Sequence, residues 1–466
     1  MRRLLLPVAL VASIAAACAS APPSTTPTNA PTTTKTSTTA ATAATAATAA
    51  TPADVRRVVS VSATDPIINI RVAFATGSVD DPAGKGGLTA LTANLMNEAT
   101  ADLDAAALND AMFPLAAELY VQVDKEATVF IARIHRDHEQ RFLAILRDVL
   151  TRPRFDDADF KRLRDEQLAF LQSTLRTGND EALQREALEL AIFPSGPYAH
   201  TPSGTVTGLQ AITLDDVRAH KEAVFAVDRV VVGVSGGASP AFVDGLVAAV
   251  ATLPARSAPR VTIPAPTTTT KANSLVIVDK PSAGTAISLG YALPSLDRAH
   301  PDYAAMKLAE TWFGEHRNLI GHLFHSMREV RGLNYGDYAY VEHFVEEPGS
   351  TFERTNIPRQ QQYFSMWIRP VEHKNRLFAL KMTAWELQRF VDGGIPDDES
   401  FKRVQDFVMG YWPGKEAEPM RALGYALDRV LTPIPVDRAG LRAAVKALTR
   451  AQVNAAIARH LKKDGL

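Results

Sequence analysis

Arg328 and Tyr335 are the residues whose types and spacing point most directly to chemistry. They stand seven positions apart in segment 327–336, on either side of a Gly-Leu pair. A guanidinium can hold the carbonyl oxygens of a peptide in a fixed geometry, and a phenol can donate one hydrogen bond. Donors aimed at the oxyanion of a tetrahedral transition state favour peptide hydrolysis. The structural alternative is that Arg328 pairs with Glu329 or Glu342, and that Tyr335 is an ordinary strand aromatic.

Segment 327–336 resembles the substrate-binding Arg/Tyr signature of the insulinase/pitrilysin family of zinc peptidases. Segment 77–82, followed by Gly86-Gly87-Leu88, is similar to the lead-in to the metal helix of that family, which carries H-x-x-E-H. In that motif two His at i and i+4 share a helix face and converge on Zn²⁺. The Glu between them then acts as general base toward the metal-bound water. The resemblance covers about residues 57–466.

The three motif positions implied by this resemblance hold no metal ligand. Counted from Gly87, they are Ala90, Ala93 and Asn94. An alanine can neither coordinate a metal nor accept a proton. The third ligand of the family is a Glu on a later helix, and its place falls near Leu171 and Gln172. We therefore expect no metal bound by this chain, and zinc only in a partner subunit.

Other histidines have weaker claims to a metal. His322, His325 and Glu329 are spaced i, i+3 and i+7, so they can share one face of a helix. A polar helix surface has the same pattern, and we favour that interpretation. His135 and His138 flank a predicted strand-to-helix junction and are poorer candidates.

The first residues of the chain are typical of an exported lipoprotein. Arg2 and Arg3 precede an apolar run, 4–17, which ends at Cys18, the single cysteine of the chain. We predict a lipoprotein-type signal peptide over 1–18 with lipidation of Cys18, although the cysteine could instead be lost with the signal. An Ala/Thr/Pro-rich stretch over 19–53 predicts a disordered tether. These features predict a protein of the cell envelope, anchored to a membrane by lipid, on the periplasmic side of a Gram-negative cell.

Composition supports a globular body and argues against nucleic acid. The 466 residues are 46% hydrophobic and 22% charged, with a formal net charge of -1. A nucleic-acid-binding protein usually has a basic footprint. We therefore expect no nucleic acid partner.

The globular part is predicted to be a duplication. Three segments return in the same order 235 to 241 positions later: 141–144 at 376–379, 156–163 at 397–404, and 214–217 at 450–453. In both halves a predicted strand, over 128–134 and 363–369, leads into a helix, and a second helix follows a double Asp. This pattern predicts an α+β fold with two homologous domains, over 54–253 and 273–466, joined by a linker over 254–272. Each domain should be a mainly antiparallel sheet with helices packed on one face.

The second domain is expected to be truncated. The first half ends with a predicted strand over 229–234 and a helix near 239–252. At the repeat distance, the equivalent strand would begin at about residue 465, where the sequence stops.

The resemblance implies a protein that is inactive alone. We expect a substrate-binding or regulatory subunit of a heterodimeric zinc metalloendopeptidase, similar to bacterial two-chain members of the family and to mitochondrial processing peptidase. Arg328 and Tyr335 would contact the peptide substrate and support the oxyanion, while an H-x-x-E-H partner supplies zinc and base. The alternative is a peptide-binding or scaffold lipoprotein without any hydrolytic role.

Overall fold

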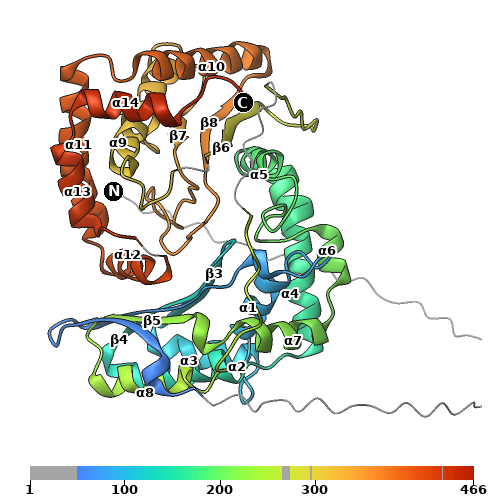
Figure 1. Ribbon diagram of the computed structural model, residues 1–466. Coiled ribbons are helices and arrows are strands. Elements are labelled where there is room, and N and C mark those ends of the chain that lie inside the picture. Colours follow the sequence, from blue (N-terminus) through green and yellow to red (C-terminus); the bar gives the residue numbers. More distant parts are fainter. Residues whose placement is uncertain (1–49, 265–272, 294–295, 433) are drawn as a thin grey trace, which may run out of the picture. The chain divides into compact units, whose positions relative to one another are not determined.

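The computed structural model describes residues 50–264, 273–293, 296–432 and 434–466. These residues belong to one compact unit, which contains one β-sheet from each half of the chain (Figure 1). The predicted signal peptide, Cys18 and most of the tether lie outside the described residues, as does 265–272 of the linker. Residues 254–264 of the linker are described and form no helix or strand.

The first sheet has five strands in the order β1-β5-β2-β4-β3. Only β1 and β5 pair in parallel, and the other neighbours are antiparallel. All but one residue of the central strand β2 are buried, because both faces of the sheet are covered. The strands are β1 (Arg56–Val61), β2 (Ile67–Phe74), β3 (Glu118–Val123), β4 (Thr128–His135) and β5 (Val230–Gly236).

The helices of the first half pack mainly on one face of this sheet. The core there joins apolar residues of β2, β4 and β5 to those of α3 and α8. The α-helices are α1 (Leu88–Met96), α2 (Ala105–Met112), α3 (Glu139–Thr151), α4 (Asp157–Ala169), α5 (Asp180–Ile192), α6 (Val206–Ala211), α7 (Leu214–Val224) and α8 (Pro240–Val250). A π-helical segment, η5 (Phe170–Gly178), continues α4, and short 3₁₀ turns are η1 (Pro52–Asp54), η2 (Ser78–Asp80), η3 (Phe113–Leu115), η4 (Arg136–His138) and η6 (Val227–Arg229).

The second half repeats the central part of the first sheet. Its strands, β6 (Thr285–Ala292), β7 (Asp337–Tyr340) and β8 (Tyr363–Val371), have the order β6-β8-β7 and are antiparallel, like β2-β4-β3. Among the described residues, no strand takes the places of β1 and β5. The helical elements are α9 (Tyr303–Gly314), η7 (Phe324–Glu329), η8 (His373–Asn375), α10 (Arg376–Gly393), α11 (Asp398–Glu416), α12 (Pro419–Leu431), α13 (Arg438–Ala447) and α14 (Arg450–His460). Within the described ranges, every helix is too short or too polar to cross a lipid bilayer.

The double Asp that marks the repeat begins a helix in each half, as expected. The Asp156 carboxylate accepts hydrogen bonds from the first backbone amides of α4, and the Asp397 carboxylate accepts one from the Ser400 amide at the start of α11. A carboxylate there satisfies orphan N–H groups and interacts favourably with the helix dipole.

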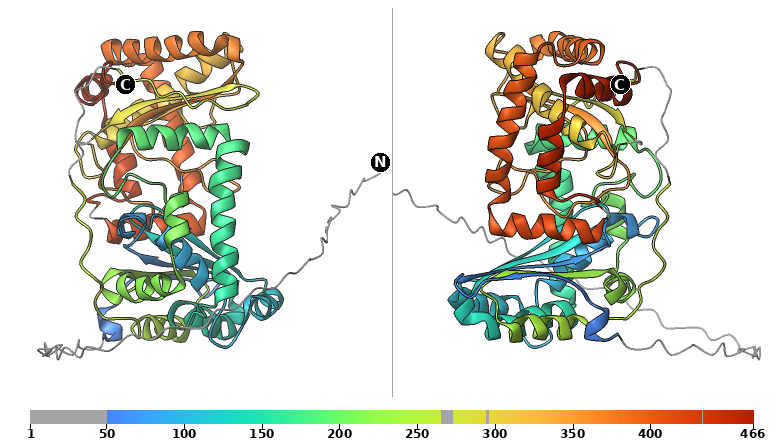
Figure 2. Two further views of the ribbon diagram at one scale, coloured as in Figure 1. Left: turned by 90° about the vertical axis from the view of Figure 1, so that its right-hand side faces the viewer. Right: turned by 60° about the vertical axis from the view of Figure 1, so that its left-hand side comes forward.

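Helix α12 of the second half covers the other face of the first sheet, which the sequence did not predict. Leu423 and Leu427 share a buried apolar cluster with Val231 of β5 and with residues of β2 and β4. Figure 2 shows α12 lying across these strands. A Cβ on Gly233 would approach Leu427 to 2.4 Å, so glycine permits this close contact.

Candidate functional site

Helix α1, which carries the degenerate metal motif, is held at its first turn by Asp81. Its carboxylate accepts hydrogen bonds from the Gly87 amide (2.6 Å) and from the amide and hydroxyl of Thr89 (2.7 Å each). Gly87 has φ of +105°, a conformation that favours glycine. These hydrogen bonds hold the first turn of the helix at the expected place.

The motif positions on α1 offer no set of metal ligands. Ala90 and Ala93 are buried and Asn94 is exposed. Leu171, at the expected place of the third ligand, belongs to the buried cluster that includes Leu88 and Leu91 of α1. Leu171 therefore packs in the same cluster as the motif helix and offers it an apolar side chain. Gln172 is exposed.

Two histidines that the sequence did not single out lie beside α1. His220 Nε2 is 2.8 Å from Thr89 Oγ1, and His200 Nε2 is 3.0 Å from Asp81 Oδ2. Burial lowers the pKa of His220 and so favours its neutral form. Both imidazoles stabilise the start of α1. They come from 119 and 131 residues further along the chain, and no local pattern marks them.

Arg328 and Tyr335 are brought into contact by the turn between them. The carbon of the Arg328 guanidinium lies 4.4 Å from the centre of the Tyr335 ring and 4.6 Å from that of Phe324. Gly332, with φ of +62°, donates its amide to the Arg328 carbonyl at 2.8 Å and ends the helical segment. The helical segment begins at residue 322 rather than at about 317, its part η7 is π-helical, and β7 begins three residues after Asn334. The expected strand start at Asn334 was therefore early.

The acids that could have paired with Arg328 are engaged elsewhere. Glu329 pairs with His325 at 2.7 Å, and Glu342 pairs with Arg298 at 3.1 Å. The Tyr335 side chain is 68% exposed and Arg328 is half-buried. In the described part of the chain, therefore, a guanidinium without a carboxylate partner stacks on a solvent-accessible phenol. Neither of the two pairings expected under the structural alternative occurs among the described residues.

A second arginine adds positive charge beside Tyr335. The Arg369 guanidinium is 5.5 Å from the centre of the Tyr335 ring, and it pairs with Glu181 of α5 at 2.7 Å. Asp337, two residues after Tyr335, is buried, and burial raises its pKa to about 7. Among the described residues its carboxyl accepts one hydrogen bond, from the side-chain amide of Asn334 at 2.7 Å. Tyr335 therefore lies beside two guanidinium groups, of which Arg369 is paired with Glu181.

The weaker histidine candidates form separate pairs. His322 Nε2 lies 2.9 Å from Glu386 of α10, whereas His325 pairs with Glu329. His135 Nδ1 accepts the Asp137 amide and belongs to a cap. None of these contacts gathers three ligands around one point.

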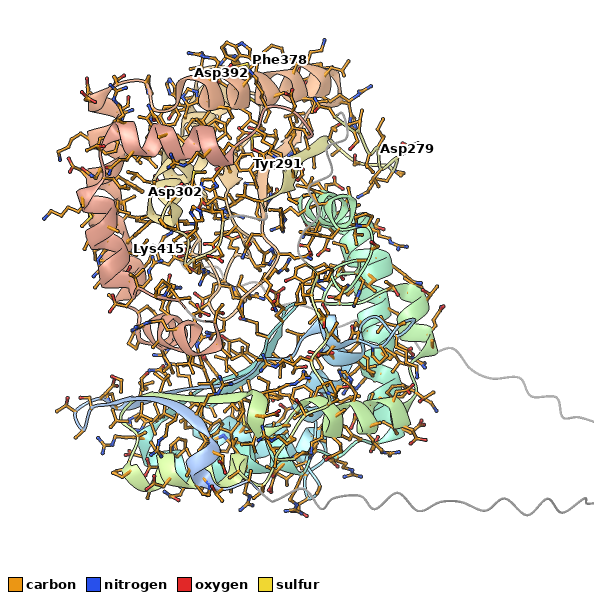
Figure 3. All side chains as sticks on the ribbon, in the orientation of Figure 1. Asp279, Tyr291, Asp302, Phe378, Asp392 and Lys415 are labelled. Atoms are coloured by element: carbon orange, nitrogen blue, oxygen red, sulfur yellow. The ribbon has the colours of Figure 1, made fainter. Side chains whose placement is uncertain are left out.

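One group of three potential metal ligands does occur among the described residues, where α14 ends and α9 begins: His300, Asp302 and His460. His460 Nε2 is 2.8 Å from the Asp302 carboxylate, which also accepts two hydrogen bonds of 2.9 Å from Arg459 (Figure 3 labels Asp302). Arg459, through these bonds, lowers the pKa of Asp302. The Arg459 guanidinium already neutralises the Asp302 carboxylate. The contacts of Asp302 with Arg459 and His460 therefore connect α14 to the start of α9.

The two halves are connected by a buried cluster of charges that the sequence did not reveal. Arg359 donates to Asp124, at the turn after β3, at 2.7 and 3.1 Å, and to Glu189 of α5 at 2.9 Å. Lys125 lies 3.0 Å from the same Glu189. Burial would raise the pKa of both carboxyls, but Arg359 outweighs it and holds them ionised.

Comparisons with known proteins agree with this architecture. Residues 57–193 match the model of the insulinase family, peptidase family M16, and residues 211–406 match the peptidase M16 inactive domain. The non-peptidase homolog YmxG of Helicobacter pylori is 25% identical over 171 residues, which are 37% of this chain and 39% of that protein. The uncharacterized zinc protease YmxG of Bacillus subtilis is 20% identical over 189 residues, 41% of this chain and 46% of that protein. The aligned part is thus less than half of each relative.

Solved structures show the same fold over most of the chain. A peptidase M16 inactive domain from Pseudomonas fluorescens has a TM-score of 0.74 at 23% identity, covering 88% of this chain and 94% of that one. A protease from Helicobacter pylori has a TM-score of 0.73 at 14% identity, covering 87% and 94%. With two M16-like domains, the chain belongs to the insulinase family of peptidases, family M16.

Proposed function

We propose that this protein is the substrate-binding subunit of a two-chain zinc peptidase in the cell envelope. A partner subunit with an intact H-x-x-E-H helix supplies the zinc and the general base. Arg328 and Tyr335 of this chain contact the peptide and stabilise the oxyanion. The contact between an exposed phenol and a guanidinium that has no carboxylate partner among the described residues is the observation that carries the proposal.

The selective change at the two sites supports this assignment. The metal positions Ala90 and Ala93 are buried and apolar, whereas Arg328 keeps a charge that no carboxylate of the described chain neutralises. An arginine without a partner gains most from an anion or a carbonyl oxygen. A developing oxyanion is such a group, and a positioned donor contributes about 100-fold to kcat.

The test is a reconstituted peptidase. This chain is co-purified with a candidate H-x-x-E-H protein of the same organism, and kcat/KM is measured on an internally quenched peptide. Arg328→Ala should lower kcat/KM about 100-fold, and Tyr335→Phe about tenfold, since one donor is lost in each case. Arg328→Lys should recover only part of the activity, because an ammonium lacks the planar fork of a guanidinium.

Arg141→Ala is the matched control. Arg141 is an exposed arginine of α3, and its replacement should leave kcat/KM unchanged. If Arg328→Ala has the kcat/KM of the unchanged complex while the subunits still co-purify, the catalytic-support role is wrong. Absence of any H-x-x-E-H partner would favour the alternative of a peptide-binding or scaffold lipoprotein.

The envelope location is part of the same proposal. Lipidation of Cys18 and a tether over 19–53 would hold the globular body near a membrane surface. Metabolic labelling with a palmitate analogue should mark the natural protein and leave Cys18→Ala unlabelled.

A further inference from the structure

A cavity of about 790 Å³ lies between α10, the start of α11 and the segment that precedes η7. Neither Arg328 nor Tyr335 lines it. Its volume lies in the range of sites that bind drug-sized ligands. The family motifs discussed above do not account for it.

One wall of the cavity is a stack of flat rings. Trp312 of α9 lies parallel to His322, with ring centres 4.9 Å apart, and it stacks on Phe390 of α10 at 5.3 Å. Trp385, also on α10, lines the cavity with 47% of its surface exposed. Such a wall favours a planar apolar group of a ligand.

The acids of the cavity are already paired. Glu386 is buried and pairs with His322 at 2.9 Å, and Asp392 pairs with Lys463 at 3.1 Å. The fixed negative charge of the cavity is therefore largely compensated before any ligand arrives.

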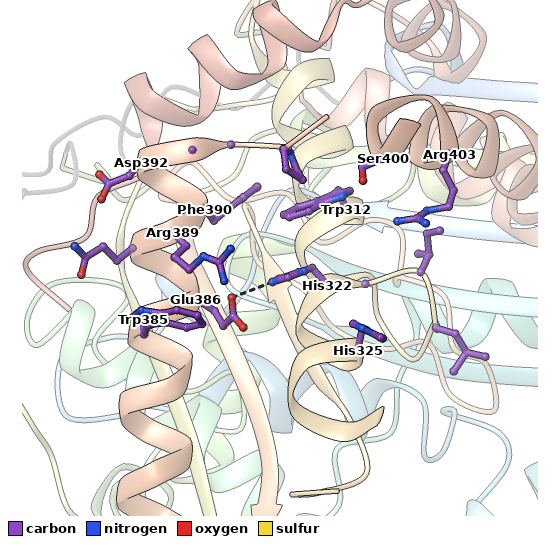
Figure 4. A pocket seen from close by; sticks show the side chains of 17 residues that line it. Trp312, His322, His325, Trp385, Glu386, Arg389, Phe390, Asp392, Ser400 and Arg403 are labelled. Atoms are coloured by element: carbon purple, nitrogen blue, oxygen red, sulfur yellow. Dashed lines mark hydrogen bonds and ion pairs between the residues drawn. The ribbon is translucent and has the colours of Figure 1, made fainter. Parts of the chain in front are cut away.

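The two arginines of the cavity lack such partners in the part of the chain that the structure describes. Figure 4 shows the guanidinium groups of Arg389, from α10, and Arg403, from α11, pointing into the cavity from opposite sides of His322. The Arg389 guanidinium lies over Trp385, 4.6 Å from the ring centre. Two guanidinium groups that form no ion pair among the described residues, beside an aromatic wall, favour a ligand that joins an anion to a flat apolar group.

We propose that this cavity binds the free carboxyl terminus of a peptide that ends in an aromatic residue. Arg389 or Arg403 pairs with the terminal carboxylate from its side of His322, and the aromatic side chain packs against the accessible edge of the Trp312–His322 stack. A terminal residue carries both groups on one Cα atom, so a single residue satisfies the charge and the apolar wall. The remaining volume holds the one or two residues before it.

The experiment is calorimetric titration of the full chain with two tripeptides, acetyl-Ala-Ala-Phe with a free carboxylate and the same peptide with a C-terminal carboxamide. The carboxylate form should bind at least about tenfold more tightly, since charge-assisted hydrogen bonds are stronger than neutral ones. The double variant Arg389→Gln, Arg403→Gln should lose about tenfold in affinity for the carboxylate peptide. Its affinity for the carboxamide should stay within about twofold.

Arg429→Gln provides the matched control, because Arg429 is an exposed arginine of α12 outside the cavity. This variant should bind the carboxylate peptide like the unchanged chain, and circular dichroism should show the same fold for all variants. Equal affinities for the carboxylate and carboxamide peptides would overturn the proposal. So would unchanged binding by the double variant, or no binding of either peptide at millimolar concentration.

Discussion

Asp337 is a buried carboxyl near the Arg328–Tyr335 pair, and it should make the stability of the protein depend on pH. Burial raises its pKa to about 7, and one of its oxygens has no hydrogen-bond partner among the described residues. A pKa that is higher in the folded than in the unfolded state gives stability that is complete below about pH 4. That stability is lost as the pH rises through 7.

Asp337→Asn should therefore stabilise the protein in alkaline solution. An amide keeps the shape of the protonated carboxyl and the hydrogen bond from Asn334, but it never becomes charged. At pH 8.5 the variant should exceed the unchanged protein in free energy of unfolding by about 4 kcal/mol, with little difference at pH 4. Urea titrations at both pH values measure this. A pH-independent difference would mean that Asp337 does not titrate in this range.

Residues whose role is local could be predicted from the sequence, and residues whose role is distant could not. Asp156 and Asp397 begin helices because a carboxylate can bond to backbone amides two or three residues ahead. Arg328 was marked by its family spacing to Tyr335. Arg359 contacts Asp124 across 235 positions, and no pattern in either segment signals the pairing. The stacking of Trp312 on His322 likewise depends on how α9 meets the next segment.

Among the helices, α12 is the one whose packing against a sheet was not predicted from the sequence. It covers the face of the first sheet opposite to α3 and α8, and Leu427 is fully buried there. Leu427→Ala should lower the free energy of unfolding by about 3 kcal/mol, because the removed atoms leave a cavity against β5. Leu377→Ala is the matched control: Leu377 of α10 is 64% exposed, and its loss should cost less than about 0.5 kcal/mol. Equal effects of the two changes in urea unfolding would show that α12 does not seal this face.

The strands were easier to predict than the layers. Both β4 and β8 begin at the predicted residues, because continuous β-branched and aromatic runs mark buried strands. The face that a helix covers is set by tertiary contacts. The amphipathic pattern of α12 shows that it buries one side, and the pattern alone does not tell against which sheet. In the second half, no strand among the described residues takes the positions that β1 and β5 have in the first half. Leu275 to Val278 of this half are exposed.

For the whole molecule, the Arg359 cluster is the contact that should matter most to the association of the halves. Arg359 neutralises Asp124 and Glu189 of the first half, and all three side chains are buried. Removing the arginine leaves two carboxylates without their main partner. Arg359→Ala should lower the free energy of unfolding by about 4 kcal/mol at pH 8, and Arg359→Lys by less.

The pH dependence of this loss separates charge from packing. Arg359 holds the pKa of Asp124 and Glu189 below their ordinary values, against the effect of burial. A lowered pKa gives stability that is present above the unfolded-state value and is lost as the pH falls. Without Arg359 the two carboxyls can take up protons, so the deficit of Arg359→Ala should shrink between pH 8 and pH 4. A deficit that is the same at both pH values would mean that Arg359 acts by filling space, and the halves would then be held together chiefly by α12 on the first sheet.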